Sequence, residues 1–237
     1  MQDTIRVAAA GDVHCAPALR DHVMRAFAGV TDADLILLAG DLTTRGEPEQ
    51  AAVLAEACAT TRTPVIAVLG NHDYHCGAGD EVAEILRAAG VTVLCRDTTI
   101  VEIRGHEVGI VGTKGFVGGF PGAELPDFGE PLLRAVYHET TEEVDAIEAG
   151  LEAIAGCHRR IVLLHYAPVR ETLEGEPEGI WAFLGCSRLA GPIGAHRPDL
   201  VLHGHAHRGN HVGAIGEVPV RNVAIHVTGD DFTLLEL

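Results

Sequence analysis

The chain has 237 residues, of which 47% are hydrophobic, and its formal net charge at pH 7 is −17. This composition supports a buried core and excludes an intrinsically disordered chain. The negative charge argues against a surface for duplex nucleic acid, because such surfaces use Lys and Arg to neutralise phosphates. The sequence also lacks an apolar run of about 18 residues, the length of a membrane-spanning helix, so no membrane partner is expected.

The cysteines and the first residues of the chain indicate in which cellular compartment the protein is expected. The six cysteines form no Cys-x-x-Cys pair, which excludes a zinc-ribbon or thioredoxin-like motif. An apolar segment begins by Ile5, and no basic region followed by an apolar stretch, as in a signal peptide, precedes it. We therefore expect a cytoplasmic protein with reduced thiols. The sequence leaves the oligomeric state open.

Short apolar runs alternate with helical patterns over the first part of the chain. Strands are expected at residues 4–10, 34–39 and 64–69, and helices at residues 18–30 and 47–61. Strand–helix–strand alternation predicts a parallel sheet that is built from right-handed crossovers.

The rest of the chain continues in the same way. A tight link at residues 104–106 predicts a β-hairpin, and the tail from Val218 to Leu235 alternates as antiparallel strands do. Two stretches near residues 112–129 and 166–189 are expected as long loops without regular structure, inserted into a single domain over residues 1–237. Between these features we expect helices at 81–89 and 130–155 and strands at 91–94, 98–103, 107–111, 160–164 and 199–202.

Five of the predicted strands are followed by side chains that bind metal ions. In open α/β sheets, ligands bind at the carboxyl ends of the strands, so these side chains are expected to converge. They offer nitrogen and oxygen donors without a thiolate, which suits Mn, Fe or Zn better than a soft metal. In chain order they are Asp12 and His14; Asp41; Asn71, His72 and Asp73; His165; His205 and His207.

The spacing within each motif fits this chemistry. Asp12 and His14 are two residues apart, so in an extended segment both side chains can reach one ion. His205 and His207 have the same spacing, but in a loop they can serve adjacent ions. Each motif alone has an ordinary explanation, since Gly-Asp forms turns and Asn or Asp caps helices. The prediction depends on all five motifs, in this order, each at a strand end.

This order of motifs resembles the calcineurin-like metallophosphoesterase superfamily over about residues 5–210. The resemblance implies an α/β fold, a four-layer αββα sandwich of mixed sheets, with two divalent or trivalent ions of Mn, Fe or Zn at the strand ends. It also implies that His72 lies beside the metals without binding one, and that Asp73 orients its imidazole. The implied ligands are Asp12, His14 and His207 for one ion, Asn71, His165 and His205 for the other, and Asp41 as the bridge.

Three positions near these motifs remain open. The family often has Gly-Asp-x-x-Asp at the second motif, and here Thr44 replaces the outer Asp. Arg45 falls where one branch of the family has a phosphate-contacting Arg, but a surface arginine before a helix explains it equally well. His75 follows the Gly-Asn-His-Asp turn and is a second candidate for contacting substrate.

These features predict a binuclear metallophosphoesterase that cleaves a small phosphorylated substrate, either a monoester or a diester. A metal-bridging hydroxide would attack phosphorus in line, and His72 would protonate or stabilise the departing oxygen. One alternative is a metal-binding scaffold of the same fold without activity, although the complete set of motif residues argues against it. Another is a nuclease that acts on short oligonucleotides.

Overall fold

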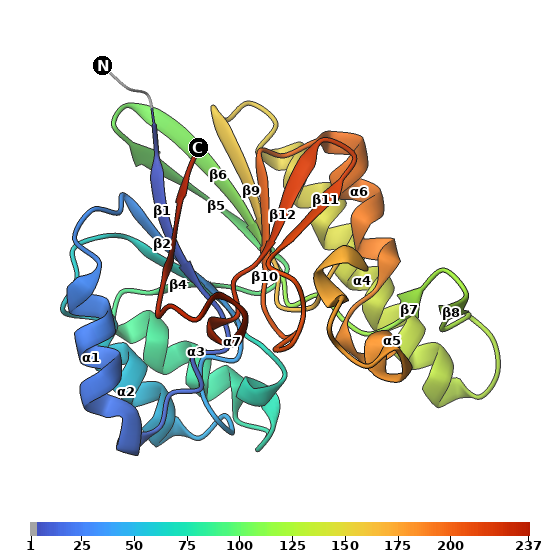
Figure 1. Cartoon of the computed structure of the whole chain (residues 1–237), viewed down its shortest axis with the longest axis horizontal. Coiled ribbons are helices and arrows are strands. Elements are labelled where there is room, and N and C mark those ends of the chain that lie inside the picture. Colours follow the sequence, from blue (N-terminus) through green and yellow to red (C-terminus); the bar gives the residue numbers. More distant parts are fainter. Residues whose placement is uncertain (1–3) are drawn as a thin grey trace.

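The computed structural model describes residues 4–237. Two mixed β-sheets pack face to face, and helices cover the outer face of each sheet, which gives the expected four-layer αββα sandwich (Figure 1). No helix in the described part of the chain has the length and apolar character needed to cross a bilayer.

The first sheet has five strands in the order β13-β1-β2-β3-β4. Strands β1 to β4 are parallel, and β13 runs antiparallel to β1 at the edge. Three helices, α1, α2 and α3, pack on the outer face of this sheet. The bounds are β1 Arg6–Ala10, β2 Leu35–Ala39, β3 Val65–Val68, β4 Thr92–Leu94, β13 Thr233–Glu236, α1 Arg20–Gly29, α2 Pro48–Cys58 and α3 Gly79–Ala88.

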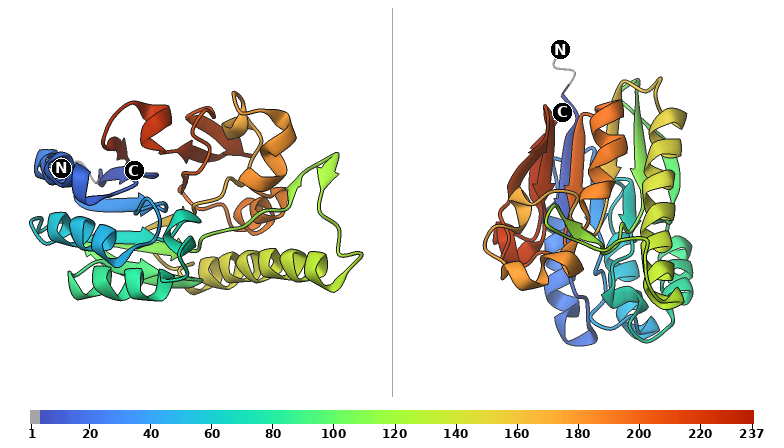
Figure 2. Two further views of the ribbon diagram at one scale, coloured as in Figure 1. Left: turned by 90° about the horizontal axis from the view of Figure 1, so that it is seen from below. Right: turned by 90° about the vertical axis from the view of Figure 1, so that its right-hand side faces the viewer.

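The second sheet has six strands in the order β11-β12-β10-β9-β6-β5, and α4 and α6 cover its outer face. Figure 2 shows α4, the longest helix, running along one side of the molecule. The four central strands are parallel to one another, while β5 and β11 are antiparallel edges. The bounds are β5 Asp97–Ile103, β6 His106–Gly112, β9 Arg159–Leu163, β10 Leu200–His203, β11 Val212–Ile215, β12 Val218–Asn222, α4 Pro131–Ala153 and α6 Ala190–His196.

Side chains of the buried strands alternate between two cores. In β1, Val7 and Ala9 face the second sheet, while Ala8 and Ala10 pack against the helices. Successive residues of a strand point to opposite faces, so a strand that is covered on both sides reads as a continuous apolar run. This explains why β2 is Leu-Ile-Leu-Leu-Ala without a polar residue.

Two expectations about the second half of the chain are wrong. The predicted antiparallel tail contains a short helix, α7 (Ile225–Thr228), and β12 is parallel to β10, although β11 and β13 are antiparallel to their neighbours. The two insertions are not structureless, because a small core that includes Phe120, Leu173 and Leu184 holds them together. They contain β7 Gly119–Phe120, β8 Ala123–Glu124, η3 Glu171–Leu173, η4 Glu178–Ile180, α5 Trp181–Leu184 and η5 Ser187–Leu189.

The close approach of α4 to β6 generates a stability prediction. A Cβ added at Gly150 would lie 2.7 Å from Val111 Cγ1, whereas a Cβ at Gly29 in α1 would meet nothing within 4 Å. Gly→Ala at an open helical site stabilises by about 0.5–1 kcal/mol, but overpacking a core costs about 1–3 kcal/mol. We expect Gly29→Ala to raise the free energy of unfolding in urea and Gly150→Ala to lower it. Equal shifts in the two variants would contradict the packing that we describe.

Candidate metal centre

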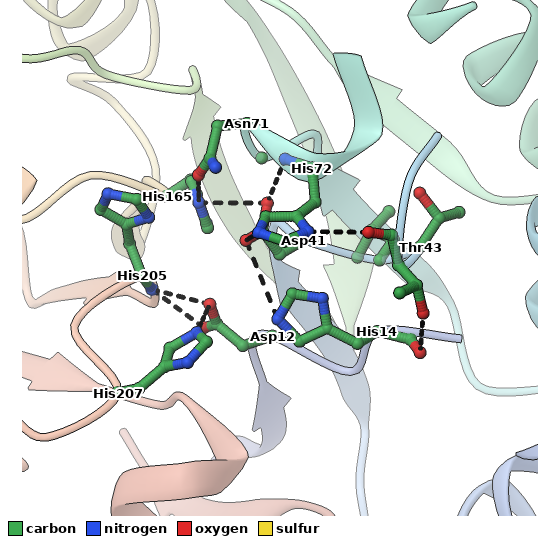
Figure 3. Close-up of polar contacts among 12 residues, drawn as sticks. Asp12, His14, Asp41, Thr43, Asn71, His72, His165, His205 and His207 are labelled. Atoms are coloured by element: carbon green, nitrogen blue, oxygen red, sulfur yellow. Dashed lines mark hydrogen bonds and ion pairs between the residues drawn. The ribbon is translucent and has the colours of Figure 1, made fainter. Parts of the chain in front are cut away.

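The side chains of the five motifs meet at one edge of the sandwich, beyond the C-terminal ends of β1, β2, β3, β9 and β10 (Figure 3). The motifs that lie furthest apart in the chain are in direct contact, since His207 Nε2 is 2.8 Å from Asp12 Oδ1. The expected convergence of strand ends therefore occurs.

One group of donors consists of Asp12, His14, Asp41 and His207, whose ligand atoms all lie within 4.8 Å of one another. Donors on opposite sides of a zinc-like ion lie about 4.2 Å apart, because each bond is about 2.1 Å. The group can therefore hold one ion with modest movement. Three of these four residues are the predicted ligands of the first ion, and the fourth is the predicted bridge.

A second group contains Asp41 again, with His165 and His205, within the same 4.8 Å limit. Asn71 completes it, since its Oδ1 lies 2.9 Å from His165 Nε2. Asp41 offers Oδ1 at 3.3 Å from His165 and Oδ2 at 3.9 Å from His14. The two oxygens of one carboxylate therefore face the two groups separately, as a bridging ligand requires.

Hydrogen bonds at the rings select tautomers that leave lone pairs directed into the site. The Ala39 carbonyl accepts a hydrogen bond from His165 Nδ1 at 2.9 Å, which leaves the lone pair on Nε2. His165 Nε2 then lies 2.9 Å from Asn71 Oδ1 and 3.3 Å from Asp41 Oδ1, so the three atoms face one another as ligands of one cation do. Similarly, the Phe183 carbonyl accepts a hydrogen bond from His205 Nε2 at 3.2 Å. This leaves the lone pair of His205 on Nδ1, which can bind a metal ion.

Burial keeps two of these imidazoles neutral, which is the form that binds metals. Desolvation, with His165 nearby, lowers the pKa of His205 to about 3. Burial also lowers the pKa of His14, although the charge of Asp41 opposes this shift. Burial alone would raise the pKa of Asp12, but the hydrogen bond from His207, with His165 nearby, brings it to about 2. Asp12 is therefore ionised at neutral pH.

The backbone at the site is unusual. Asp12, His14, Asp41 and His205 all have positive φ, between 47° and 69°, in the left-handed region that non-glycine residues rarely adopt. Such conformations persist where the surrounding structure imposes them, and they occur frequently at functional sites. They turn the chain sharply after each strand, so that the side chains project over the sheet edge.

Two glycines allow the loops to approach one another. A Cβ at Gly70 would lie 2.2 Å from the backbone nitrogen of Asp41, and a Cβ at Gly40 would lie 2.5 Å from His165 Nδ1. Gly40 also has a φ of +81°. Any larger residue at these positions would displace a candidate ligand.

His72 is oriented by a different residue from the one that we expected. Its Nδ1 donates to the Thr44 carbonyl at 2.7 Å, so its Nε2 is left free on the side of Asp41, 3.9 Å from Oδ2. Thr44 is itself anchored, because its hydroxyl donates to the His14 carbonyl at 2.7 Å. Thr44, which stands where the family often has an Asp, therefore links the His72 ring to the loop of His14 through two hydrogen bonds.

The expectation that Asp73 orients His72 is therefore wrong. The buried carboxylate of Asp73 accepts hydrogen bonds from the backbone nitrogens of Leu42, Thr43 and Gly70 and from the Thr43 hydroxyl. The side chain of Asp73 therefore points back into the loops, where it binds these four donors. Its role is to fix the Asp41 loop against the turn of η2 (His72–Tyr74).

The two candidate substrate residues lie outside the ligand groups. Arg45 is exposed, and its backbone forms hydrogen bonds with the Gln50 side chain and with the backbone of Cys76. His75 is also exposed, and its ring centroid is 6.2 Å from that of His72. A role for either residue in substrate binding remains a prediction.

Sequence reasoning missed two aromatic neighbours of the ligands. His226 of α7 stacks on His207, with ring centroids 4.4 Å apart and an interplanar angle of 8°. Tyr166 places its buried ring 4.4 Å from that of His205. His226 follows β12, which is parallel to β10, so the strand-end rule would have found it if the tail had not been taken as antiparallel.

Comparison with known proteins gives a family. The model of the calcineurin-like phosphoesterase family matches residues 5–209. A comparison with curated proteins finds no match. Among solved structures, phosphopantetheinyl hydrolase (PptH) from Mycobacterium tuberculosis is 15% identical over 99% of this chain and 97% of its own, with a TM-score of 0.73.

Two further structures share the fold. A putative 5′-nucleotidase from Staphylococcus aureus is 17% identical over 93% of this chain and 48% of its own, with a TM-score of 0.58. The purple acid phosphatase PPD1 from yellow lupin is 16% identical over 90% of this chain and 38% of its own, with a TM-score of 0.53. The match to the family model covers most of the chain, and the donor groups lie within it. The chain therefore belongs to the calcineurin-like phosphoesterase family, whose members are metal-dependent phosphoester hydrolases.

Proposed function

We propose that this protein is a binuclear metallophosphoesterase that hydrolyses small phosphorylated substrates. The observation that carries the proposal is the position of Asp41, whose carboxylate belongs to both donor groups. A carboxylate that is shared in this way fits two adjacent ions better than one. Asn71, His165 and His205 would hold one ion with Asp41, and Asp12, His14 and His207 would hold the other.

The donor set defines the chemistry that the site would support. Two bound transition-metal ions would bring the pKa of a water molecule toward neutrality and offset charge on the phosphoryl oxygens. The protein contributes neutral imidazoles, ionised Asp12 and a rigid arrangement of loops. Nitrogen and oxygen donors of this kind accept Mn, Fe or Zn, and the metals are left open here.

His72 is the residue that we assign to proton transfer. Its Nδ1 is engaged by the Thr44 carbonyl, and its Nε2 lies beside Asp41 at the exposed side of the donor groups. When the ring carries a proton on both nitrogens, Nε2 can donate its proton from this position to the oxygen that leaves phosphorus and becomes the neutral nitrogen, while the Nδ1 hydrogen bond to Thr44 keeps the ring in place. Arg45 and His75 remain candidates for contacting the substrate.

The proposal leaves the choice between monoester and diester open. The proteins that share this fold are named as a phosphopantetheinyl hydrolase, a putative 5′-nucleotidase and a purple acid phosphatase, so the fold alone does not choose between the two classes of ester. The net charge of −17 disfavours duplex nucleic acid, and we propose no such partner. We also propose a cytoplasmic location, since the six cysteines carry free thiols.

The first alternative is a scaffold that binds metals without catalysis, and the second is a nuclease acting on short oligonucleotides. Hydrolysis assays with 4-nitrophenyl phosphate, bis(4-nitrophenyl) phosphate and a trinucleotide, each with added Mn²⁺, separate the three functions. Activity on the chromogenic esters supports the proposal, and a strong preference for the trinucleotide supports a nuclease. A metal-loaded protein without activity on any of them is a scaffold.

The two donor groups predict a metal stoichiometry. We expect two ions per chain in the wild-type protein after loading with Mn²⁺ and removal of unbound metal. His14→Ala and Asn71→Ala should each lose about one ion, whereas Asp41→Ala should lose both, because it belongs to both groups. Elemental analysis of the purified variants measures this. A wild-type protein that holds a single ion would overturn the binuclear assignment.

The position of His72 predicts a separation of metal binding from turnover. His72→Ala should retain both ions and lower kcat by about 10²–10⁴-fold, the usual contribution of a general acid. His138→Ala, on the surface of α4, is the matched control and should leave kcat unchanged. If His72→Ala hydrolyses its best substrate at the wild-type rate, His72 has no part in the mechanism.

A further inference from the structure

The single lysine of the chain, Lys114, lies in the first insertion beside the metal centre. Its backbone carbonyl accepts hydrogen bonds from the backbone nitrogens of both His165 and Tyr166, each at 3.0 Å. The loop that carries Lys114 is therefore fixed to the strand end that carries a candidate ligand.

The ammonium of Lys114 is half-buried and incompletely paired. Nζ donates to the Gly115 carbonyl at 3.1 Å and lies 4.0 Å from the ring centroid of Phe116. It also lies 5.3 Å from the ring centroid of Tyr166. Within residues 4–237 no carboxylate forms an ion pair with it. An ammonium has three donor hydrogens, so two of them remain available to a ligand.

The nearby carboxylates are already occupied by other groups. Glu143 is buried and accepts from the Thr113 hydroxyl, the Gly115 nitrogen and the Arg96 guanidinium. Arg96 also pairs with Glu139 and Glu142. Arg96 is thereby paired with three acids, and among the described residues that line the cavity at this position Lys114 is the cation without a carboxylate ion-pair partner.

Lys114 lines a cavity that reaches the catalytic turn. The cavity has a volume of about 250 Å³ and is lined by Tyr74, Cys95, Arg96, Lys114, Glu139 and Glu143. Tyr74 belongs to η2, the same turn that carries His72. On the other side, the Tyr166 ring lies between Lys114 and the His205 ring, 4.4 Å from the latter. Lys114 is therefore separated from the candidate ligand His205 by a single aromatic ring, and it shares its cavity with Tyr74 of the turn that carries His72.

We propose that Lys114 is a specificity-determining residue that binds a second anionic group of the substrate, separate from the phosphoryl group at the metals. The free donors of Lys114 would pair with a carboxylate or phosphate oxygen on the part of the substrate that extends into the cavity. Such charge-assisted hydrogen bonds are stronger than neutral ones. The proposal rests on the proposed function, and it narrows the substrate class to phosphoesters that carry a further anion.

Binding of non-hydrolysable phosphonates tests the proposal without using activity. Propylphosphonate, 3-phosphonopropionate and 1,3-propylenebisphosphonate share a phosphonate head and differ in a neutral, carboxylate or phosphonate tail. Their Kd values would be measured by calorimetry on Mn-loaded protein freed of unbound metal. We expect at least one of the two anionic tails to improve Kd by about tenfold or more, as loss of a hydrogen bond to a charged group implies. The tail with the larger gain identifies the anion.

Variants of Lys114 test whether this residue causes the improvement in Kd that an anionic tail gives. Lys114→Met should reduce the advantage of the anionic tail to about twofold or less, and Lys114→Arg should restore it. If Lys114→Met does not fold, Lys114→Gln gives the same comparison. Arg104→Met is the matched control, because it removes one positive charge from the turn between β5 and β6, at the opposite end of β6 from Lys114. It should keep the full advantage.

Two results would overturn the proposal. One is a wild-type protein that binds all three phosphonates equally, and the other is a Lys114→Met protein that keeps the preference for an anionic tail. Both results leave the metal centre intact, since propylphosphonate would still bind. By contrast, failure of propylphosphonate itself to bind the metal-loaded protein would count against the proposed phosphoesterase function as well.

Discussion

The Asp41 carboxylate is the constraint on which the rest of the site depends. One of its oxygens faces His165 and the other faces His14, so its position fixes the spacing between the two donor groups. To reach that position the chain turns through a left-handed residue directly after β2. Gly70 lacks the side chain that would displace it, and Asp73 ties its loop to the turn of η2.

The cost of this arrangement is offset by the sheets below it. Each residue in a sparsely populated backbone region costs about 1–3 kcal/mol, and four candidate ligands are in such a region. Strand β2 is buried at every residue and β1 at every residue except Arg6, and this burial holds the loops at the sheet edge. Loops that were less firmly anchored would relax to ordinary conformations and separate the donors.

In the function that we propose, chemistry and selectivity would come from different parts of the chain. The strand ends supply the donor groups and His72, whereas the two insertions supply the residues around them. The second insertion contributes the Tyr166 ring and the Phe183 carbonyl beside His205, and the first contributes Lys114. This division explains why the motif residues indicate phosphoester hydrolysis in general but carry no information about the substrate.

The sequence by itself determined the α/β class, most strands and helices, and the set of side chains at the strand ends. These features follow from local patterns, because burial on two faces requires continuous apolar runs and strand ends share one edge. The tertiary structure alone decided that Thr44 rather than Asp73 orients His72, and that Lys114 lies beside the Tyr166 ring. Such contacts depend on how separate loops pack together, which no spacing along the chain encodes.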